Sequence, residues 1–256
     1  MKIDFHLHYL VSAPHFLDER LRLMDEAQVA WSVLHPLPHL SFTGAICGDN
    51  ADVLRAVNAH PRRFVGSIYL DPRERDCLET LERYAGEGFR CVKMWPPIGF
   101  YPDTPRFAKV FERIQELGLP ILFHAGLTNI GRQYDSKYAD PIRVEGLVRR
   151  YPETKHILAH WGGLGTFQTA WAMMKANRNV YLDASTPDWS WPGVELYRLY
   201  SALTPIDFGR VVWGTDNLQT PGEGVRTISA LLGEIGKEDH ALACLGETAK
   251  QLLRLP

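Results

Sequence analysis

Two histidines lie two residues apart near the start of the chain, and this spacing suits metal binding. In the opening run MKIDFHLHYL, apolar residues alternate with Asp4, His6 and His8, which is the period-two pattern of a strand with two different faces. Residues two apart project from the same face, so His6 and His8 would present their imidazoles to one point. Neutral imidazoles are typical ligands of zinc and similar divalent ions. One such pair can arise by chance, so its meaning depends on the rest of the chain.

The remaining sequence alternates between strand-like and helix-like segments. Strands are expected in the opening run and at residues 29–34, 64–70, 89–94, 119–124, 156–160, 180–183 and 211–214. Helices are expected at residues 17–27, from an N-cap at Asp49 to residue 59, and at 73–85, 105–117, 141–150, 166–176, 194–203 and 224–255. Eight strand–helix units without a break in composition predict an α/β fold, a single-domain (β/α)8 TIM barrel covering residues 1–256.

The segments that follow the expected strands are longer than those that precede them. Segments 95–104, 125–140, 184–193 and 215–223 are rich in proline, glycine and aromatic residues, whereas the link at 87–88 is short. A barrel needs only a few residues for each link, and barrel enzymes build their sites at the carboxyl ends of the strands. The loop lengths therefore predict an active site on that rim.

Histidines and one aspartate stand at the expected carboxyl ends of four strands. They are His6 and His8 on strand one, His124 on strand five, His160 on strand six and Asp216 on strand eight. The carboxyl ends of barrel strands converge, so residues far apart in the sequence could meet there. Several nitrogen ligands and one carboxylate, with a position left open for water, form the ligand set of a catalytic metal site.

The motifs around these residues resemble those of the amidohydrolase superfamily. The HxH pair, FHAG, LAHWGG and WGTDN are most similar to amidohydrolase family 2, which contains mononuclear hydrolases, lactonases and decarboxylases of the amino-carboxymuconate-semialdehyde type. The C-terminal LGETAKQLLRL is similar to the LGENAxRLL ending of that family, with Thr248 in place of asparagine. The resemblance covers nearly the whole chain and implies one divalent metal ion, zinc with manganese as the alternative, held by His6, His8, His124 and Asp216.

The resemblance also implies catalytic roles for Asp216 and His160. Asp216 would ligate the metal and accept a proton from a water whose pKa the ion lowers to about 7. His160, at or just beyond coordination distance, could stabilise an oxyanion or protonate a leaving group. This chemistry predicts hydrolysis of a C–O or C–N bond in a lactone, ester or amide. Decarboxylation of an aromatic or muconate-type acid at the same site is the alternative, and a catalytically silent barrel that binds a ligand is the third reading.

Candidate substrate contacts lie near the same rim. In binuclear members of the superfamily a carboxylated lysine bridges two metals, and Lys93 occupies the matching strand end; a substrate contact or an ion pair are its other readings. Trp95 and Trp161, in or beside rim loops, suggest an apolar, ring-shaped substrate. Arg132 and Arg143 could bind a substrate carboxylate bidentately.

The composition is that of an ordinary globular protein. Hydrophobic residues make up 45% and charged residues 23% of 256 residues, with a formal charge of −2, which argues against nucleic-acid and anionic-membrane partners. No apolar run approaches the roughly 20 residues that span a bilayer, and no signal peptide is apparent. Four scattered cysteines without a CxxC pair suit the reducing cytoplasm. We therefore expect a cytoplasmic protein with a small-molecule substrate, and the family resemblance adds a homodimer as an expectation.

Overall fold

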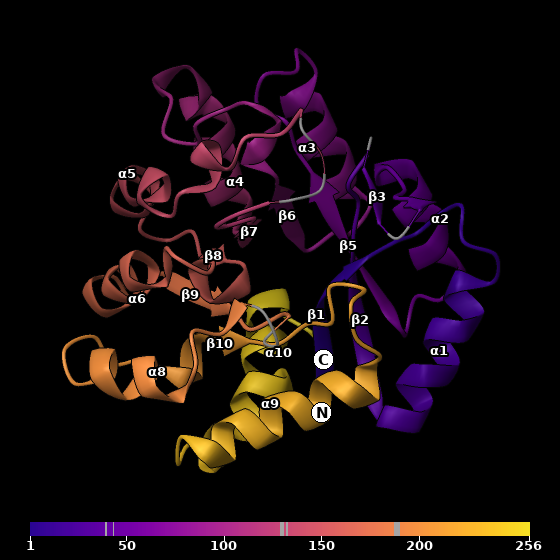
Figure 1. Cartoon of the computed structure of the whole chain (residues 1–256). Coiled ribbons are helices and arrows are strands. Elements are labelled where there is room, and N and C mark those ends of the chain that lie inside the picture. Colours follow the sequence, from indigo (N-terminus) through magenta and orange to yellow (C-terminus); the bar gives the residue numbers. More distant parts are fainter. Residues whose placement is uncertain (39, 43, 129–130, 132, 187–189) are drawn as a thin grey trace.

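The computed structural model describes residues 1–38, 40–42, 44–128, 131, 133–186 and 190–256. Eight parallel strands follow one another around a barrel, as Figure 1 shows. Their bounds are β1 (Lys2–His8), β2 (Val29–His35), β5 (Phe64–Tyr69), β6 (Cys91–Met94), β7 (Ile121–Phe123), β8 (His156–Leu158), β9 (Val180–Asp183) and β10 (Val211–Val212). Phe5 N donates to Trp213 O at 2.8 Å, which joins the last strand segment to the first. The predicted (β/α)8 barrel is confirmed.

Helices surround the sheet (Figure 1). The α-helices are α1 (Phe16–Ala27), α2 (Asn50–Ala59), α3 (Cys77–Gly86), α4 (Ala108–Leu117), α5 (Ile142–Arg150), α6 (Phe167–Ala176), α8 (Val194–Ser201), α9 (Pro221–Glu234) and α10 (Thr248–Leu253). Short 3-10 turns are η1 (Pro96–Ile98), η2 (Pro105–Phe107), η3 (Ser136–Ala139), η4 (His160–Gly162), η5 (Phe208–Arg210) and η6 (Glu238–His240), and η7 (Ala243–Glu247) is a π-helical segment. The predicted N-cap at Asp49 is confirmed, because its side chain accepts from Asp52 N.

Two helix predictions are wrong in their bounds. The helix expected from residue 73 begins at Cys77, because Arg73 instead donates its Nη2 to the Asp71 carboxylate at 2.6 Å and joins the preceding turn. The continuous helix expected over 224–255 ends at Glu234, where Gly236 turns the chain with a φ of 66°. The tail then continues through η6, η7 and α10. A two-stranded hairpin of β3 (Ser41–Phe42) and β4 (Ala45–Ile46) was not predicted.

The strict alternation expected in the opening run breaks within β1. The register against β2 shifts between Asp4 and Leu7, which marks an irregularity of the bulge kind. Phe5 packs with Val33 in one apolar cluster, whereas Leu7 packs in another, larger one. The Asp4 carboxylate accepts from Thr215 Oγ1 at 2.7 Å and from His6 N at 3.3 Å.

Apolar packing separates the two ends of the barrel. Inward-facing residues form a cluster that also includes Ala249, Leu253 and Leu255 from the C-terminal segment, so α10 closes the end where the strands begin. The larger cluster fills the space between the sheet and the outer helices. The polar residues that the sequence singled out are thus left for the opposite end, where the strands finish.

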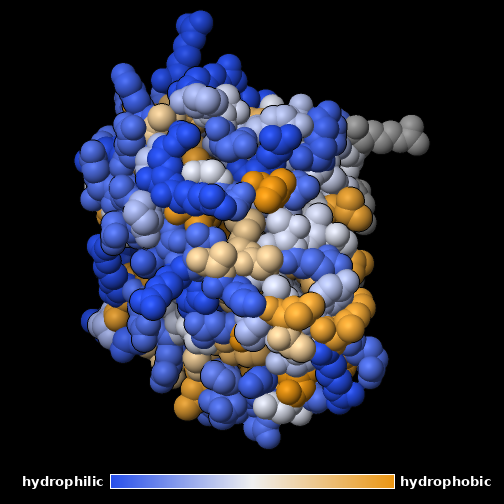
Figure 2. All heavy atoms as spheres, turned by 90° about the vertical axis from the view of Figure 1, so that its left-hand side faces the viewer, coloured by the Kyte–Doolittle hydropathy of each residue, from blue (hydrophilic) through white to orange (hydrophobic). Residues whose placement is uncertain are grey.

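The outer surface is mainly hydrophilic. Figure 2 views the molecule from the side of α5, α6 and α8 and shows a mainly hydrophilic face on which hydrophobic residues gather toward the lower right. Leu199 and Leu203, near the end of α8, are 63% and 70% exposed. Within the described part of the chain, no helix is both long and apolar enough to cross a membrane.

His156, at the start of β8, makes the stability of the fold depend on pH. Its ring is buried and stacks on Phe123 at a centroid distance of 6.2 Å, and its Nε2 lies 3.4 Å from Tyr151 O. Burial lowers the pKa of His156 to about 4. Between the unfolded pKa of about 6.5 and this value, the unfolded chain binds a proton at this position that the folded protein does not, so acid favours unfolding.

We predict that His156→Leu weakens the acid sensitivity of the fold. The free energy of unfolding of the parent should fall by about 2–3 kcal/mol between pH 7 and 4.5 through this residue alone, since one pKa unit corresponds to about 1.4 kcal/mol. Urea unfolding at both pH values measures the difference. The exposed His15→Leu should retain the parental loss, and an equal loss in the His156 variant would contradict the prediction.

Candidate metal centre

Three predicted ligand atoms converge at the carboxyl end of the barrel. His6 Nε2 lies 3.2 Å from His8 Nε2, and Asp216 Oδ1 lies 3.5 Å from the former and 3.3 Å from the latter. All three residues are buried. They form a group whose ligand atoms lie within 4.8 Å of one another and could hold a metal ion.

The hydrogen bonds behind the rings indicate which nitrogens carry lone pairs. His8 Nδ1 lies 3.2 Å from His35 O, and a carbonyl only accepts, so the proton of His8 is on Nδ1. Lys93 Nζ lies 2.9 Å from His6 Nε2, and an ammonium only donates, so the lone pair of His6 is on Nε2. The two imidazole lone pairs and one carboxylate oxygen form a donor set that fits a divalent cation.

Lys93, at the end of β6, is a buried cation in this centre. Burial lowers the pKa of Lys93 to about 8, against the opposing effect of Asp216 and Asp183. Burial alone would raise the pKa of Asp216, but its contact with His8 and the nearby charges lower it. Asp216 is therefore ionised at neutral pH, and a positive charge already lies beside the lone pair of His6.

His124 and His160 extend the cluster from just beyond β7 and β8; the strands predicted to end at these histidines end at Phe123 and Leu158, and His160 begins η4. The ring of His160 stacks on His6 at a centroid distance of 5.4 Å, and the ring of His124 lies 5.1 Å from that of His160. His124 belongs to neither of the two convergent groups found among the described residues, so its metal-binding role stays a prediction. Its Nε2 is buried with no hydrogen-bond partner in the described chain. Burial lowers the pKa of His160 to about 4 and that of His124 well below its usual value, so both rings are neutral at pH 7.

Sequence reasoning missed Asp183 and Ser185. Asp183 ends β9, and its Oδ2 lies 2.8 Å from His6 Nδ1. Burial raises the pKa of Asp183 to about 7. Together with His6 and His160, it forms the second group that could hold a metal. The signal was available, because the motif VYLDAS places this carboxylate at the end of an expected strand.

The backbone is strained where the site residues follow the strands. Residues other than glycine with a positive φ include a group at this rim, namely His160 (56°), Trp161 (57°), Thr186 (51°), Asp216 (48°) and Asn217 (60°). Each such residue costs about 1–3 kcal/mol and persists only where the surroundings hold it. Asn217 provides one such support: it accepts from His8 N at 2.7 Å and donates to His8 O at 2.9 Å.

The predicted substrate contacts fall into different places. Trp95 is buried with its ring 5.8 Å from that of His124 and 4.6 Å from that of Tyr134. Tyr134 lines a cavity of about 380 Å³ together with Tyr69 and Ile98, so Trp95 lies between the histidine cluster and this cavity. The buried Trp161 packs on Trp191 at 4.6 Å. Arg132 lies outside the described residues.

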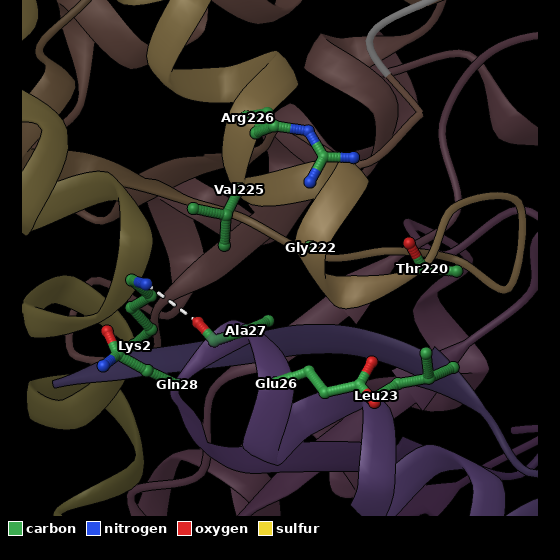
Figure 3. Close-up of a pocket in the computed structure, with 9 residues that line it drawn as sticks. All are labelled: Lys2, Leu23, Glu26, Ala27, Gln28, Thr220, Gly222, Val225 and Arg226. Atoms are coloured by element: carbon green, nitrogen blue, oxygen red, sulfur yellow. Dashed lines mark hydrogen bonds between the residues drawn. The ribbon is translucent and has the colours of Figure 1, made fainter.

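A second hollow of about 350 Å³ lies between α1 and α9, as Figure 3 shows. Lys2 Nζ donates to Ala27 O at 2.8 Å along its wall. Its lining, which includes Arg226 and Val225, contains none of the predicted site residues. Of these two hollows, only the one lined by Tyr134 adjoins a predicted site residue, through the contact between the rings of Tyr134 and Trp95.

A (β/α)8 barrel with a buried histidine and aspartate centre at the carboxyl ends of its strands defines the class of this protein. A family described as Amidohydrolase matches residues 3–255. The chain belongs to this amidohydrolase family and is an enzyme of that superfamily. The family resemblance predicted from the motifs is confirmed. No curated protein matches the sequence.

Solved structures support the fold at low sequence identity. A probable 2-pyrone-4,6-dicarboxylic acid hydrolase from Acinetobacter baumannii, with citric acid bound, is 15% identical, with a TM-score of 0.69 and 99% of each chain covered. The 2,6-dihydroxybenzoate decarboxylase from Rhizobium is 17% identical, with a TM-score of 0.68 and coverage of 100% of this chain and 99% of that one. An amidohydrolase from Burkholderia multivorans with bound zinc is 15% identical, with a TM-score of 0.70 and full coverage of both chains.

We predict that Asn217→Gly lowers both stability and metal affinity. Glycine adopts the positive φ at this position freely, so the loss reports the two hydrogen bonds to His8, about 1–3 kcal/mol. Metal affinity should fall about tenfold, because supporting contacts of a ligand typically have effects of that size. Urea unfolding and zinc titration against a chromophoric chelator measure the two effects.

Asn50→Ala is the matched control. Asn50 forms the same pair of bonds with Tyr69, accepting from its N at 2.8 Å and donating to its O at 3.0 Å. This variant should lose stability but keep the parental metal affinity. Equal metal affinities in the two variants would contradict the positioning role of Asn217.

Proposed function

We propose that this enzyme uses one divalent metal ion, zinc or alternatively manganese, to hydrolyse a C–O or C–N bond in a small lactone, ester or amide. The observation that carries the proposal is the convergence of His6 Nε2, His8 Nε2 and Asp216 Oδ1 within 3.2–3.5 Å of one another. Metal-binding relatives in the family and the zinc in the Burkholderia structure support this assignment.

The chain's own residues have distinct tasks in this proposal. His6, His8 and Asp216 would hold the ion, with His124 as the further predicted ligand. A divalent ion at this place supplies a Lewis acid that lowers the pKa of water to about 7. Asp216, ionised at neutral pH, accepts the proton of the attacking water. The neutral His160 ring beside His6 would take up this proton on its unprotonated nitrogen and then, as an imidazolium, hydrogen-bond to the developing oxyanion or protonate the leaving group.

Substrate would approach from the cavity beside Trp95. The aromatic side chains of Trp95, Tyr69 and Tyr134 favour a flat, partly apolar molecule. Trp161, directly after His160, stays a predicted substrate contact. Arg132 stays a predicted carboxylate contact.

Decarboxylation is the second candidate, because Lys93 places a buried ammonium 2.9 Å from His6 Nε2. Such a cation can bind a substrate carboxylate beside the metal ligands. The structural likeness to the Rhizobium decarboxylase also favours testing this reaction. A barrel that binds a ligand without turnover is the third outcome.

We predict that the purified protein contains about one equivalent of zinc or manganese. Elemental analysis by mass spectrometry should find this metal in the parent and its loss in a His6→Ala/His8→Ala variant, because both lone pairs are removed. His15→Ala, at an exposed histidine, is the control and should retain the metal. A parent that retains no metal after loading and desalting would overturn the metal mechanism.

We predict that Lys93→Met distinguishes the readings of Lys93. Methionine has a similar volume, but it leaves the buried Asp183 and Asp216 without the Lys93 charge, so some loss of stability is expected and the comparison is made on the folded variant. A carboxylate contact predicts unchanged metal content and a KM for acidic substrates raised about tenfold or more, consistent with about 1.5–3 kcal/mol for a charged hydrogen bond. A drop from two metal equivalents to one would instead assign a bridging lysine.

A panel of lactones, amides, aromatic acids and muconate-type acids then separates the reactions. Acid release from lactones or amides supports hydrolysis, and carbon dioxide release without either supports decarboxylation. Bound metal with no turnover on any compound supports the silent barrel. The cytoplasmic location and the homodimer remain predictions from the sequence, and the four cysteines, all buried free thiols, suit a reducing compartment.

A further inference from the structure

We propose that Asp183 and Ser185 act as a pair of positioning residues that set the tautomer of two imidazoles, His6 and His160. Both rings would then carry their proton on Nδ1 and present Nε2 to the reacting centre. This inference rests on the proposed function, which assigns His6 to the metal and His160 to proton transfer. Asp183 and Ser185 act through these histidines and need not touch the substrate.

The first step is the contact between Asp183 and His6. Asp183 Oδ2 lies 2.8 Å from His6 Nδ1, which places an acceptor behind the ring. On the other side of the same ring, the Lys93 ammonium donates to Nε2 at 2.9 Å. The two contacts require the same tautomer, with the proton on Nδ1. Ser185 N fixes the carboxylate by donating to Asp183 Oδ1 at 3.1 Å.

The second step concerns the tautomer of His160, which depends on the hydroxyl of Ser185. A serine hydroxyl has one proton, and Ser185 Oγ donates it to Asp183 Oδ2 at 2.6 Å. Toward His160 Nδ1, 3.0 Å away, the hydroxyl can then only accept, so His160 also carries its proton on Nδ1. Thr186 Oγ1, 3.2 Å from the same nitrogen, can serve as a second acceptor.

The consequence is a shared orientation of two functional rings. His6 Nδ1 and His160 Nδ1 lie 3.2 Å and 3.0 Å from the same Ser185 oxygen, so each Nε2 is on the far side of its ring from that oxygen. The buried Ser190 Oγ lies close to the backbone of Ser185 and Thr186, 2.6 Å from Thr186 O and 3.0 Å from Ser185 O. One carboxylate therefore determines how both imidazoles present their lone pairs, as a carboxylate does behind the histidine of a catalytic triad.

The first test observes the tautomers directly in the metal-free protein. Long-range ¹H–¹⁵N correlation spectra of protein labelled at histidine distinguish the two ring tautomers, and His6→Asn and His160→Gln variants assign the signals. The parent should show both rings protonated on Nδ1. In Ser185→Ala, the Thr186 hydroxyl can donate to His160, so the Nε2–H form of His160 should appear while His6 keeps its tautomer.

Ser32→Ala is the matched serine control. Ser32 is buried, and its hydroxyl lies 3.4 Å from Met24 Sδ, so its removal should leave both histidine signals unchanged. A parent with His160 protonated on Nε2, or a Ser185→Ala spectrum identical to that of the parent, would overturn the proposal. Both results can be read even if the protein has no measurable activity.

The second test separates the two halves of the pair by zinc affinity and turnover. Asp183→Asn should weaken zinc binding about 10–100-fold, because an amide cannot accept from Ser185 and His6 without also presenting a donor to one of its neighbours. Asp207→Asn is the control: its Oδ1 accepts from Gly209 N, two residues on, at 3.0 Å, and zinc binding should be unchanged. Ser185→Ala should retain zinc affinity within about threefold but lose about tenfold or more in kcat, since proton transfer contributes about 10²–10⁴-fold.

If Asp183→Asn keeps both the zinc affinity and the histidine tautomers of the parent, Asp183 is not a positioning residue. If the parent has the expected tautomers, and they shift in the variants, but it binds no zinc, the positioning pair stands and the proposed metal function fails. The two hypotheses therefore fail on different measurements.

Discussion

The candidate metal centre depends on the close approach of β1 and the segment that follows β10. Asp216 N donates to His6 O at 2.7 Å, so the backbone itself places the carboxylate of one residue against the imidazole of the other. Gly214 makes this approach feasible, because a Cβ at that position would lie 2.4 Å from His6 Cβ. The contacts that close the barrel between its last and first strands therefore also bring the side chains of His6 and Asp216 together.

A centre of this kind opposes stability. Lys93, Asp183 and Asp216 are charged or ionisable groups buried among histidines, and removing such groups from water costs several kcal/mol each unless they are paired. The positive φ values at His160 and Asp216 add strain. The apolar packing around the sheet and the cluster closed by α10 offset these costs. Function, rather than folding, explains why this end of the barrel keeps its polar groups.

Contacts behind the rings matter as much as the ligand atoms themselves. His35 O fixes the tautomer of His8, and Asp183 does the same for His6. Asn217 ties the backbone of His8 to the strained turn after Asp216. Each ligand is therefore held by a partner from a different strand or loop, which is how a rigid barrel can orient weakly directional imidazoles.

The sequence by itself determined the architecture and the strand ends on which chemistry could occur. Local periodicity and turn residues depend on neighbours along the chain, so eight strand–helix units and the cap at Asp49 were predictable. The places of His6, His8 and Asp216 at one rim followed from the barrel rule. Only the tertiary structure decided that the alternation breaks near Phe5, that Asp183 faces His6 and that His124 packs on His160. Those outcomes depend on contacts between strands distant in sequence, where register and side-chain packing, not local pattern, fix which atoms meet.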